Sequence, residues 1–329
     1  MRNIWIFNFI IGCLIRLCMS GGYMRVKEGQ LPYMIYFRSR YRGTCNGFMV
    51  ARNVAMTAAV CVTDPINPLS DLRALNIVAG STYRHQRQGI KIQVTKILIP
   101  EFPSIGNKKD YYMQKAPAVL LLRRKVPDIL VQVPVRALAV DFLGNVSLNL
   151  QDQCIIPGWH FFGKGDKIYA NFKFLLQKHL SVQFVNIVKS SLWCESLTIQ
   201  FQKALDSMGF EGQFDPGAYV CVADPDGSAQ ACHGMYGAPL LCQGRAIGML
   251  MALDAQWRSC NGFSNVIHLF NSQYLVNFMQ CVSGLFAPDP QPDWTLLQTQ
   301  LYDEPEPAYY DYVQNLYDQL TFVQGDEYY

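Results

Sequence analysis

The sequence predicts an all-β fold, because short apolar runs of strand length alternate with turn residues between residues 31 and about 250, whereas helical patterns are sparse. Residues 90–95 alternate apolar and polar side chains with a period of two, the pattern of a strand with one face in water. Strands at this spacing favour a sandwich or a barrel. We expect strands at residues 33–37, 47–50, 75–79, 90–99, 118–122, 155–157, 218–222 and 247–251.

One helical stripe is expected to close this domain. Within residues 272–282, the apolar side chains of Tyr274, Leu275, Phe278 and Met279 recur at helical spacing. After Phe286 the composition changes to a proline-containing linker and a tail rich in tyrosine and acids. We therefore predict a signal peptide at 1–20, a folded domain at 21–285 and a linker with an acidic, Tyr-rich tail at 286–329.

The N-terminus has the pattern of a secretory signal. Arg2 precedes an apolar run over residues 4–15, and Cys18-Met19-Ser20 places small residues at the two positions that signal peptidase reads. No stretch reaches the ~20 apolar residues of a membrane span. An uncleaved anchor stays open as an alternative, because Arg16 interrupts the usual cleavage region. We expect a secreted, extracellular protein with no membrane span after cleavage.

Charge is distributed unevenly along the chain. From residue 283 onward there are nine acidic residues and no Lys or Arg, so the preceding part holds all 28 basic residues and 16 of the 25 acids. Such a body can attract acidic partners, including its own tail, glycans or phosphate, although a solvated basic surface is the plainer interpretation. The basic residues are scattered without a recognition motif, so we expect no nucleic-acid partner.

The acidic tail has two features that suggest a partner. Apolar residues recur there at helical spacing, so a short amphipathic helix could form against another protein, and a disordered tail is the alternative. Tyrosines beside acids resemble sulfation sites: Tyr302, Tyr309, Tyr310, Tyr312, Tyr328 and Tyr329.

Four stretches have a distinctive order and spacing: Gly21-Gly22-Tyr23 followed by Leu31-Pro32-Tyr33-Met34; Thr57-Ala58-Ala59-Val60-Cys61; Ala118-Val119-Leu120-Leu121; and Cys232-His233-Gly234-Met235-Tyr236-Gly237-Ala238-Pro239-Leu240. Together they resemble the trypsin-like serine peptidases, from about residue 19 to residue 282. The resemblance implies two six-stranded antiparallel β-barrels with a C-terminal helix.

The chemistry of that family needs a serine nucleophile, a histidine that takes its proton and an aspartate that orients the histidine. By the resemblance, Val60 occupies the histidine position, Ala116 the aspartate position and Tyr236 the serine position. Valine and alanine can neither accept a proton nor carry charge. A phenol with a pKa of about 10 and no neighbouring base is protonated and unactivated at neutral pH. His233 lies near this loop, but no carboxylate is seen to orient it, so we expect no peptidase activity.

The supporting positions are changed as well. The aspartate that receives the new N-terminus on activation corresponds to Met235, the floor of the specificity pocket to Gln230, and the glycine at the pocket entrance to Leu253. We expect the former cleft to be partly filled.

Cysteine usage agrees with the resemblance. Nine cysteines follow the signal, an odd number, so one is left over or bonds another chain. Cys281 is the one expected to be unpaired, either as a buried or capped thiol or as the link of a covalent oligomer. The resemblance implies the pairs Cys45–Cys61, Cys154–Cys242, Cys194–Cys221 and Cys232–Cys260.

No metal or cofactor site is expected. Residues 79–90, the loop where some relatives bind calcium, contain no Asp or Glu. Asn145-Val146-Ser147 is an acceptor for N-glycosylation in a secreted protein.

Three alternative functions are compatible with these sequence features. The first is a non-catalytic homologue that binds extracellular proteins, such as proteases or their substrates, as cofactor, decoy or carrier; degenerate relatives of this type are common in insects, in immune cascades and reproductive fluid. The second is a serine-type endopeptidase with an unorthodox site. The third is a structural role in which Cys281 and the tail build covalent oligomers.

Overall fold

The computed structural model divides into two units, Met1–Asp293 and Trp294–Tyr329. All residues that the structure describes belong to the first unit, so the signal, most of the linker and the tail features predicted above lie outside them. The described residues are 23–27, 29–39, 43–63, 75–83, 89–100, 116–127, 135–148, 154–159, 161–163, 179–188, 216–224, 229–231, 235–252, 265–273 and 275–288.

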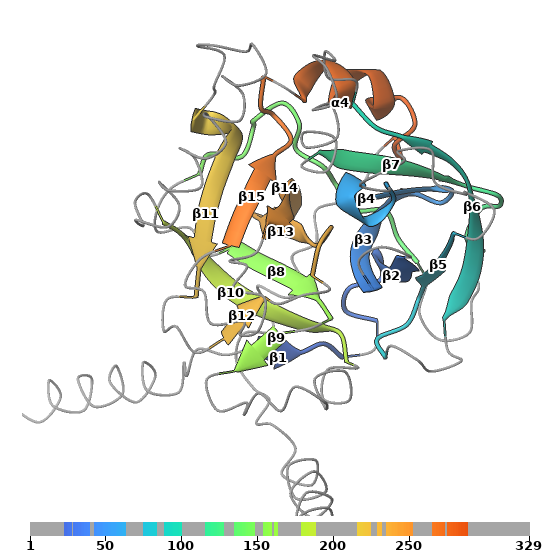
Figure 1. Ribbon diagram of the computed structural model, residues 1–329, viewed down its shortest axis with the longest axis horizontal. Coiled ribbons are helices and arrows are strands. Elements are labelled where there is room, and N and C mark those ends of the chain that lie inside the picture. Colours follow the sequence, from blue (N-terminus) through green and yellow to red (C-terminus); the bar gives the residue numbers. More distant parts are fainter. Residues whose placement is uncertain are drawn as a thin grey trace, which may run out of the picture. The chain divides into compact units, whose positions relative to one another are not determined.

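The first barrel is made of six strands that close on themselves in the order β2-β3-β4-β7-β6-β5. Each neighbouring pair is antiparallel, and β5 pairs with β2 to complete the ring. It lies on the right in Figure 1. Its strands are β2 (Met34–Ser39), β3 (Gly43–Ala51), β4 (Val54–Ala58), β5 (Asn76–Ala79), β6 (Ile90–Leu98) and β7 (Pro117–Leu122).

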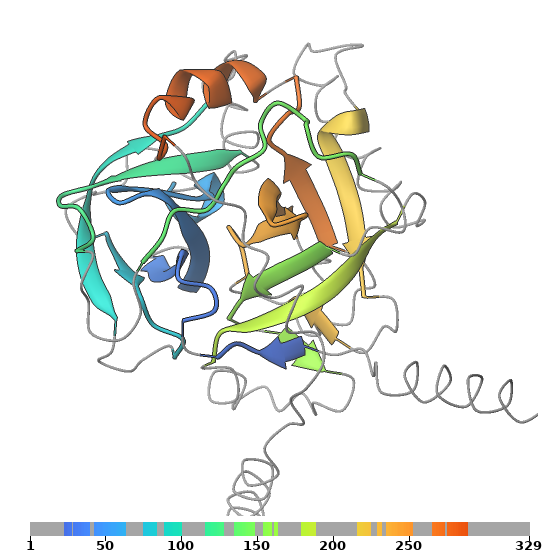
Figure 2. The ribbon, with the colours of Figure 1, turned by 180° about the vertical axis from the view of Figure 1, so that it is seen from behind.

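The second barrel also closes from six antiparallel strands, in the order β10-β11-β15-β14-β13-β8, because β8 pairs back onto β10. The view from behind in Figure 2 shows the two barrels side by side, as in Figure 1. The strands are β8 (Cys154–Gly158), β10 (Ser181–Val188), β11 (Tyr219–Ala223), β13 (Pro239–Cys242), β14 (Arg245–Ala252) and β15 (Asn265–Leu269).

Shorter elements complete the described part of the fold. Strand β1 (Tyr23–Arg25) pairs with β10, and β9 (Phe161–Gly163) pairs with β12 (Ala229–Ala231). Two short 3-10 helices are η1 (Ala59–Cys61) and η4 (Pro216–Ala218). The predicted fold class of two six-stranded antiparallel barrels with a C-terminal helix is thus confirmed.

Side-chain periodicity explains which strands could be found in the sequence. Along β6, Ile92 and Val94 are 1% exposed and face the barrel interior, while Lys91 and Thr95 face water, so the strand alternates visibly. In β4 all five residues are buried and no alternation exists. The sequence analysis did not predict β4, nor β13 and β15, whose residues are also all buried, nor β10, whose burial is mixed.

Helix α4 (Val276–Ser283) is shorter than the predicted stripe over residues 272–282. Its Met279 and Val282 are buried, as expected of a helix that covers a barrel, but Leu275 lies before the helix, and its N–H donates to the carbonyl of Ser272. Among the described residues no helix is long and apolar enough to cross a membrane.

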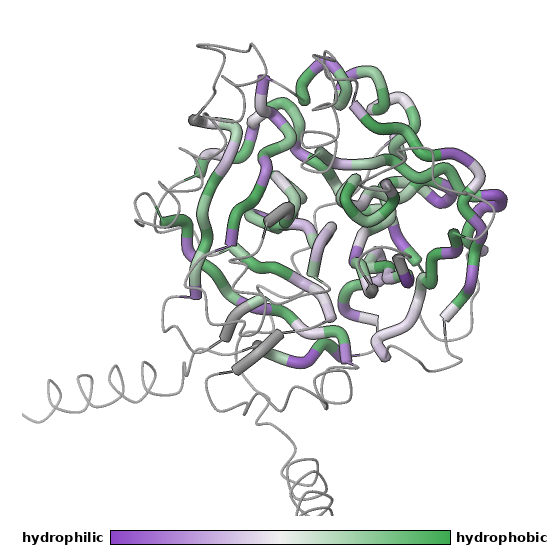
Figure 3. Tube along the Cα trace, viewed as in Figure 1, coloured by the Kyte–Doolittle hydropathy of each residue, from purple (hydrophilic) through white to green (hydrophobic). Residues whose placement is uncertain are grey.

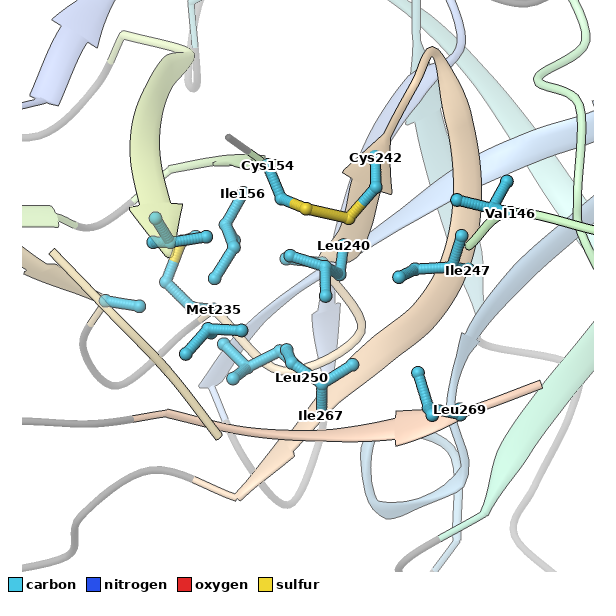
Figure 4. Close-up of a cluster of buried hydrophobic side chains, with 14 residues drawn as sticks. Val146, Cys154, Ile156, Met235, Leu240, Cys242, Ile247, Leu250, Ile267 and Leu269 are labelled. Carbon is cyan, nitrogen blue, oxygen red and sulfur yellow. A yellow bond between two sulfur atoms is a disulfide. The ribbon is translucent and has the colours of Figure 1, made fainter. Parts of the chain in front are cut away.

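A hydrophobic cluster fills the second barrel and includes a disulfide. Figure 4 shows Ile156, Leu240 and Ile267 around the bridge between Cys154 and Cys242. Another disulfide, Cys45–Cys61, lies in the first barrel. Both pairings agree with those implied by the resemblance. Cys221 is also disulfide-bonded, while its expected partner Cys194 and the pair Cys232–Cys260 involve residues outside the described ones.

The two bridges close loops of very different length, with sequence separations of 88 and 16 residues. In the loop-entropy account, closing the longer loop stabilises the folded chain by about 4–5 kcal/mol and the shorter by about 3 kcal/mol. We predict that the double variant Cys154→Ala, Cys242→Ala loses more unfolding free energy in urea than Cys45→Ala, Cys61→Ala. An equal or reversed order would contradict the prediction.

Candidate functional site

The turn that precedes β13 contains Tyr236, which the resemblance predicts at the nucleophile position. The N–H of Ala238 donates to the carbonyl of Met235 at 3.0 Å, and Gly237 at the third position has φ of +83°. This combination is typical of a type II turn, which needs glycine at that place. The N–H of Gly237 donates to Leu250 of β14 at 3.1 Å, so the turn is fixed to the second barrel.

The same turn is also bound by the first barrel, through Asn46 of β3. The N–H of Asn46 donates to the carbonyl of Tyr236 at 2.9 Å, and its side-chain oxygen accepts the N–H of Trp159 at 3.2 Å. Its amide nitrogen lies 3.8 Å from the sulfur of Met235. Asn46 is fully buried, so these contacts satisfy polar groups that would otherwise be costly at the junction of the two barrels.

The backbones approach so closely here that a side chain is excluded. A Cβ atom at Gly237 would lie 2.2 Å from the carbonyl oxygen of Asn46 and 2.5 Å from the hydroxyl of Thr57, which itself donates to that carbonyl at 2.6 Å. Gly158, at the end of β8, has a similar constraint, because its Cβ would lie 2.5 Å from Met235. We refer to Asn46, Thr57, Gly158, Met235 and Gly237 as the junction cluster.

The three predicted triad positions are brought to this junction by backbone contacts. Val60 lies in η1, directly after β4, and is 7% exposed; Ala116 precedes β7 and is fully buried. The N–H of Ala59 donates to the carbonyl of Ala116 at 2.8 Å, and the sulfur of Cys61 lies 3.8 Å from the carbonyl of Tyr236.

Tyr236 is partly buried, and its side chain packs against the hydrophobic cluster of the second barrel. Because Val60 and Ala116 are hydrocarbon side chains, they bring neither an acid nor a base to the junction.

The predicted pocket residues are seen only in part. Gln230 is in β12, where its backbone pairs with Phe162, but its side chain is not among those described. Leu253 and His233 both lie outside the described residues. Met235, expected where the family has its activation aspartate, is fully buried and contacts Asn46, so this position is filled by an apolar side chain.

The remaining candidate residues lie apart from the triad positions in the sequence. Asn145 and Ser147 are exposed, in a loop that Asp141 holds by accepting the N–H groups of Asn145 and Val146 at 3.0 and 2.7 Å. Cys281 is a free, exposed thiol on α4, so of the interpretations offered for it burial is wrong. Among the described residues no cluster of three metal-ligating side chains occurs.

One histidine near the N-terminal strand has a shifted pKa. Burial lowers the pKa of His179, and the charge of Arg25 lowers it further. Its ring packs edge-on against Tyr83 at 4.4 Å. Because both effects favour the neutral ring, His179 contributes no positive charge at neutral pH.

Sequence reasoning did not identify Asn46. The available signal was a polar residue inside the apolar strand 45–50, directly after a disulfide cysteine, where an unpaired amide would be costly.

Comparisons with known proteins agree with the geometry. The family model "Trypsin" matches residues 20–171. Among solved structures, the scabies mite inactivated protease paralogue S-D1 has a TM-score of 0.56 at 18% identity, covering 82% of this chain and 99% of that one. Neuropsin, a serine protease expressed in mouse brain, has a TM-score of 0.54 at 15% identity, covering 80% and 98%. These likenesses show that the chain has the fold of the trypsin-like serine proteases.

A curated protein also has a similar sequence. Ovochymase-2 of Mus musculus is 20% identical over 241 residues, which are 72% of this chain. The chain spans about a third of that relative's length, 34%.

The junction cluster generates a stability prediction. Gly237→Ala should lower the unfolding free energy by about 2 kcal/mol or more, because it combines a positive φ with a backbone clash. The matched control is Gly284→Ala after α4, where φ is −63° and no atom lies within 4 Å of the added methyl group. The control should stay within about 0.5 kcal/mol of the parent. Equal urea midpoints for the two variants would contradict the close approach.

Proposed function

We propose that the chain is a secreted, non-catalytic serine protease homologue that works by binding extracellular proteins as cofactor, decoy or carrier. The observation that supports this most is the burial of hydrocarbon at the positions of the family's base and acid. Val60 is 7% exposed and Ala116 is fully buried.

Acyl transfer in this fold requires a base that removes the nucleophile's proton. Valine and alanine have no lone pair for a proton, and a tyrosine hydroxyl without a base is almost wholly protonated at neutral pH. Losing triad members costs several orders of magnitude in rate in enzymes of this kind. All three changes together leave no route for proton transfer through these positions.

The surroundings of Tyr236 favour a packing role for its side chain. The ring contacts the hydrophobic cluster of the second barrel, while its backbone carbonyl accepts the N–H of Asn46. A side chain used in this way stabilises the junction between the barrels. In this proposal the chain keeps the two-barrel fold and its disulfides, while Val60, Ala116 and Tyr236 stand in place of the reactive groups.

The disulfide bridges and an exposed thiol agree with a binding role outside the cell. The disulfides Cys45–Cys61 and Cys154–Cys242 suit an oxidising compartment, in line with the signal expected at residues 1–20. The exposed thiol of Cys281 offers a point for a covalent link to a second chain.

The first test is turnover. We predict that the purified, disulfide-intact chain hydrolyses no trypsin- or chymotrypsin-type peptide ester above the uncatalysed rate and is not labelled by a fluorophosphonate probe. The Tyr236→Phe variant serves as the matched control, because it removes only the hydroxyl. Hydrolysis by the parent chain that disappears in Tyr236→Phe would overturn the proposal and identify an unorthodox endopeptidase; hydrolysis by both would indicate a contaminating peptidase.

The second test is binding. We predict that the intact chain retains a defined set of proteins from its native fluid that the reduced and unfolded chain does not retain. A version ending at Pro288 keeps the bond between the Ala287 N–H and the Val50 carbonyl, so the barrels stay complete. Proteins held by both versions bind the barrels, and those lost on truncation bind the tail. No protein specific to the folded chain would contradict the binding role.

A further inference from the structure

The outer face of the first barrel carries a cluster of cations that the barrel junction does not use. We call it the basic ridge. Three of its members are consecutive and exposed at the end of β7, and the other two come from β6 and from the turn between β3 and β4. Figure 3 shows hydrophilic segments at the end of β7 and along the neighbouring β6. The basic ridge consists of Arg52, Lys96, Arg123, Arg124 and Lys125.

Residues 123–125 are held at both ends by backbone hydrogen bonds. The N–H of Arg123 donates to the carbonyl of Gln93 at 2.9 Å, and the N–H of Val126 donates to the carbonyl of Arg52 at 2.7 Å. Val126 is buried and anchors the run. Three exposed cations are therefore presented on a fixed backbone, which lowers the entropy lost when an anion binds.

Side-chain contacts order two of the guanidinium groups. Arg52 donates through Nε and Nη2 to the carbonyl of Val126, at 3.2 and 3.0 Å. Arg123 donates through Nη1 to the side-chain oxygen of Gln93 at 3.1 Å. These contacts fix the direction in which the two guanidinium groups lie on the ridge.

A bulge in β6 brings Lys96 to the same face. Val94 pairs with Leu122, and Lys96 pairs with Leu121, so an extra residue is inserted between them. As a result, Thr95 and Lys96 are both exposed although they are consecutive. The hydroxyl of Thr95 donates to Leu121 at 3.0 Å. Lys96 is then the diagonal neighbour of Arg123 on the outer face, about 7–8 Å away in a typical pair.

The ridge lacks acidic neighbours within the described part of the first barrel, which contains no Asp or Glu at all. The two described acids are Asp141, whose carboxylate accepts two backbone N–H groups, and Asp224, at the end of β11 in the second barrel. Arg123, Arg124 and Lys125 are thus exposed with no carboxylate among the described residues of this barrel, and a run of cations of this kind attracts polyanions.

From this geometry we infer that the basic ridge binds a sulfated polysaccharide. Permanently charged sulfate oxygens fit guanidinium and ammonium donors spaced along a line. No aromatic side chain belongs to the ridge on which a nucleobase could stack. The described large hydrophobic residues that are exposed, Leu143 and Leu285, are not part of it, so it offers no apolar anchor for a lipid surface. The inference does not rest on the proposed loss of catalysis.

The test uses heparin and the full secreted chain. The ridge variant combines Arg123→Gln, Arg124→Gln and Lys125→Gln, and it keeps Arg52 because that side chain holds Val126. The control variant combines Lys27→Gln, Arg38→Gln and Arg245→Gln, which removes the same charge from other elements. We expect the parent and the control to bind heparin at 150 mM NaCl, and the ridge variant to bind about tenfold or more weakly. The plot of log affinity against log salt should be shallower for the ridge variant by about one per lost contact.

Four outcomes would overturn the inference. These are no heparin binding by the parent, equal weakening in the ridge and control variants, equal affinity of the parent for fully desulfated heparin, and equal or tighter binding to single-stranded DNA or to phosphatidylserine vesicles. Urea midpoints of both variants equal to that of the parent show that folding is unchanged. If the ridge variant unfolds more easily, Lys96→Gln with Arg124→Gln replaces it, because both side chains are exposed.

Discussion

The close approach of Gly237 to the carbonyl of Asn46 is the constraint on which the joining of the two barrels depends. At 2.2 Å from a would-be Cβ, the contact admits only glycine. Because Asn46 also accepts the hydroxyl of Thr57 and the N–H of Trp159, a single buried residue of the first barrel fixes the turn at residues 235–238 and the end of β8. The relative placement of the barrels therefore follows from a few buried backbone and amide hydrogen bonds.

The three positions that the resemblance predicts for the catalytic groups lie at this junction, and their side chains pack there. Hydrocarbon at Val60 and Ala116 costs nothing to bury, whereas an unpaired imidazole or carboxylate at such low exposure would carry a desolvation penalty. Met235 is likewise buried, with its thioether beside the amide of Asn46. The residues at the junction are thus mostly apolar, and the turn at residues 235–238 is held by backbone hydrogen bonds.

Charge is separated from this apolar junction. The described residues of the first barrel carry their cations on the outer face, most densely at the end of β7, while buried positions there carry no ionised group. The disulfide of each barrel is internal and leaves the outer face unchanged. The cations on the outer face and the apolar groups at the junction are therefore separate parts of the described structure.

The sequence by itself determined the all-β class, the strands that alternate visibly, such as β6, and the hydrocarbon nature of Val60 and Ala116, because these follow from residue type and local pattern. It could not reveal β4, whose residues are all buried and so show no periodicity, nor the start of α4 at Val276. Only the tertiary structure showed that Asn46 joins the barrels and that a bulge brings Lys96 beside Arg123. These features depend on contacts between strands distant in the chain, which local pattern cannot encode.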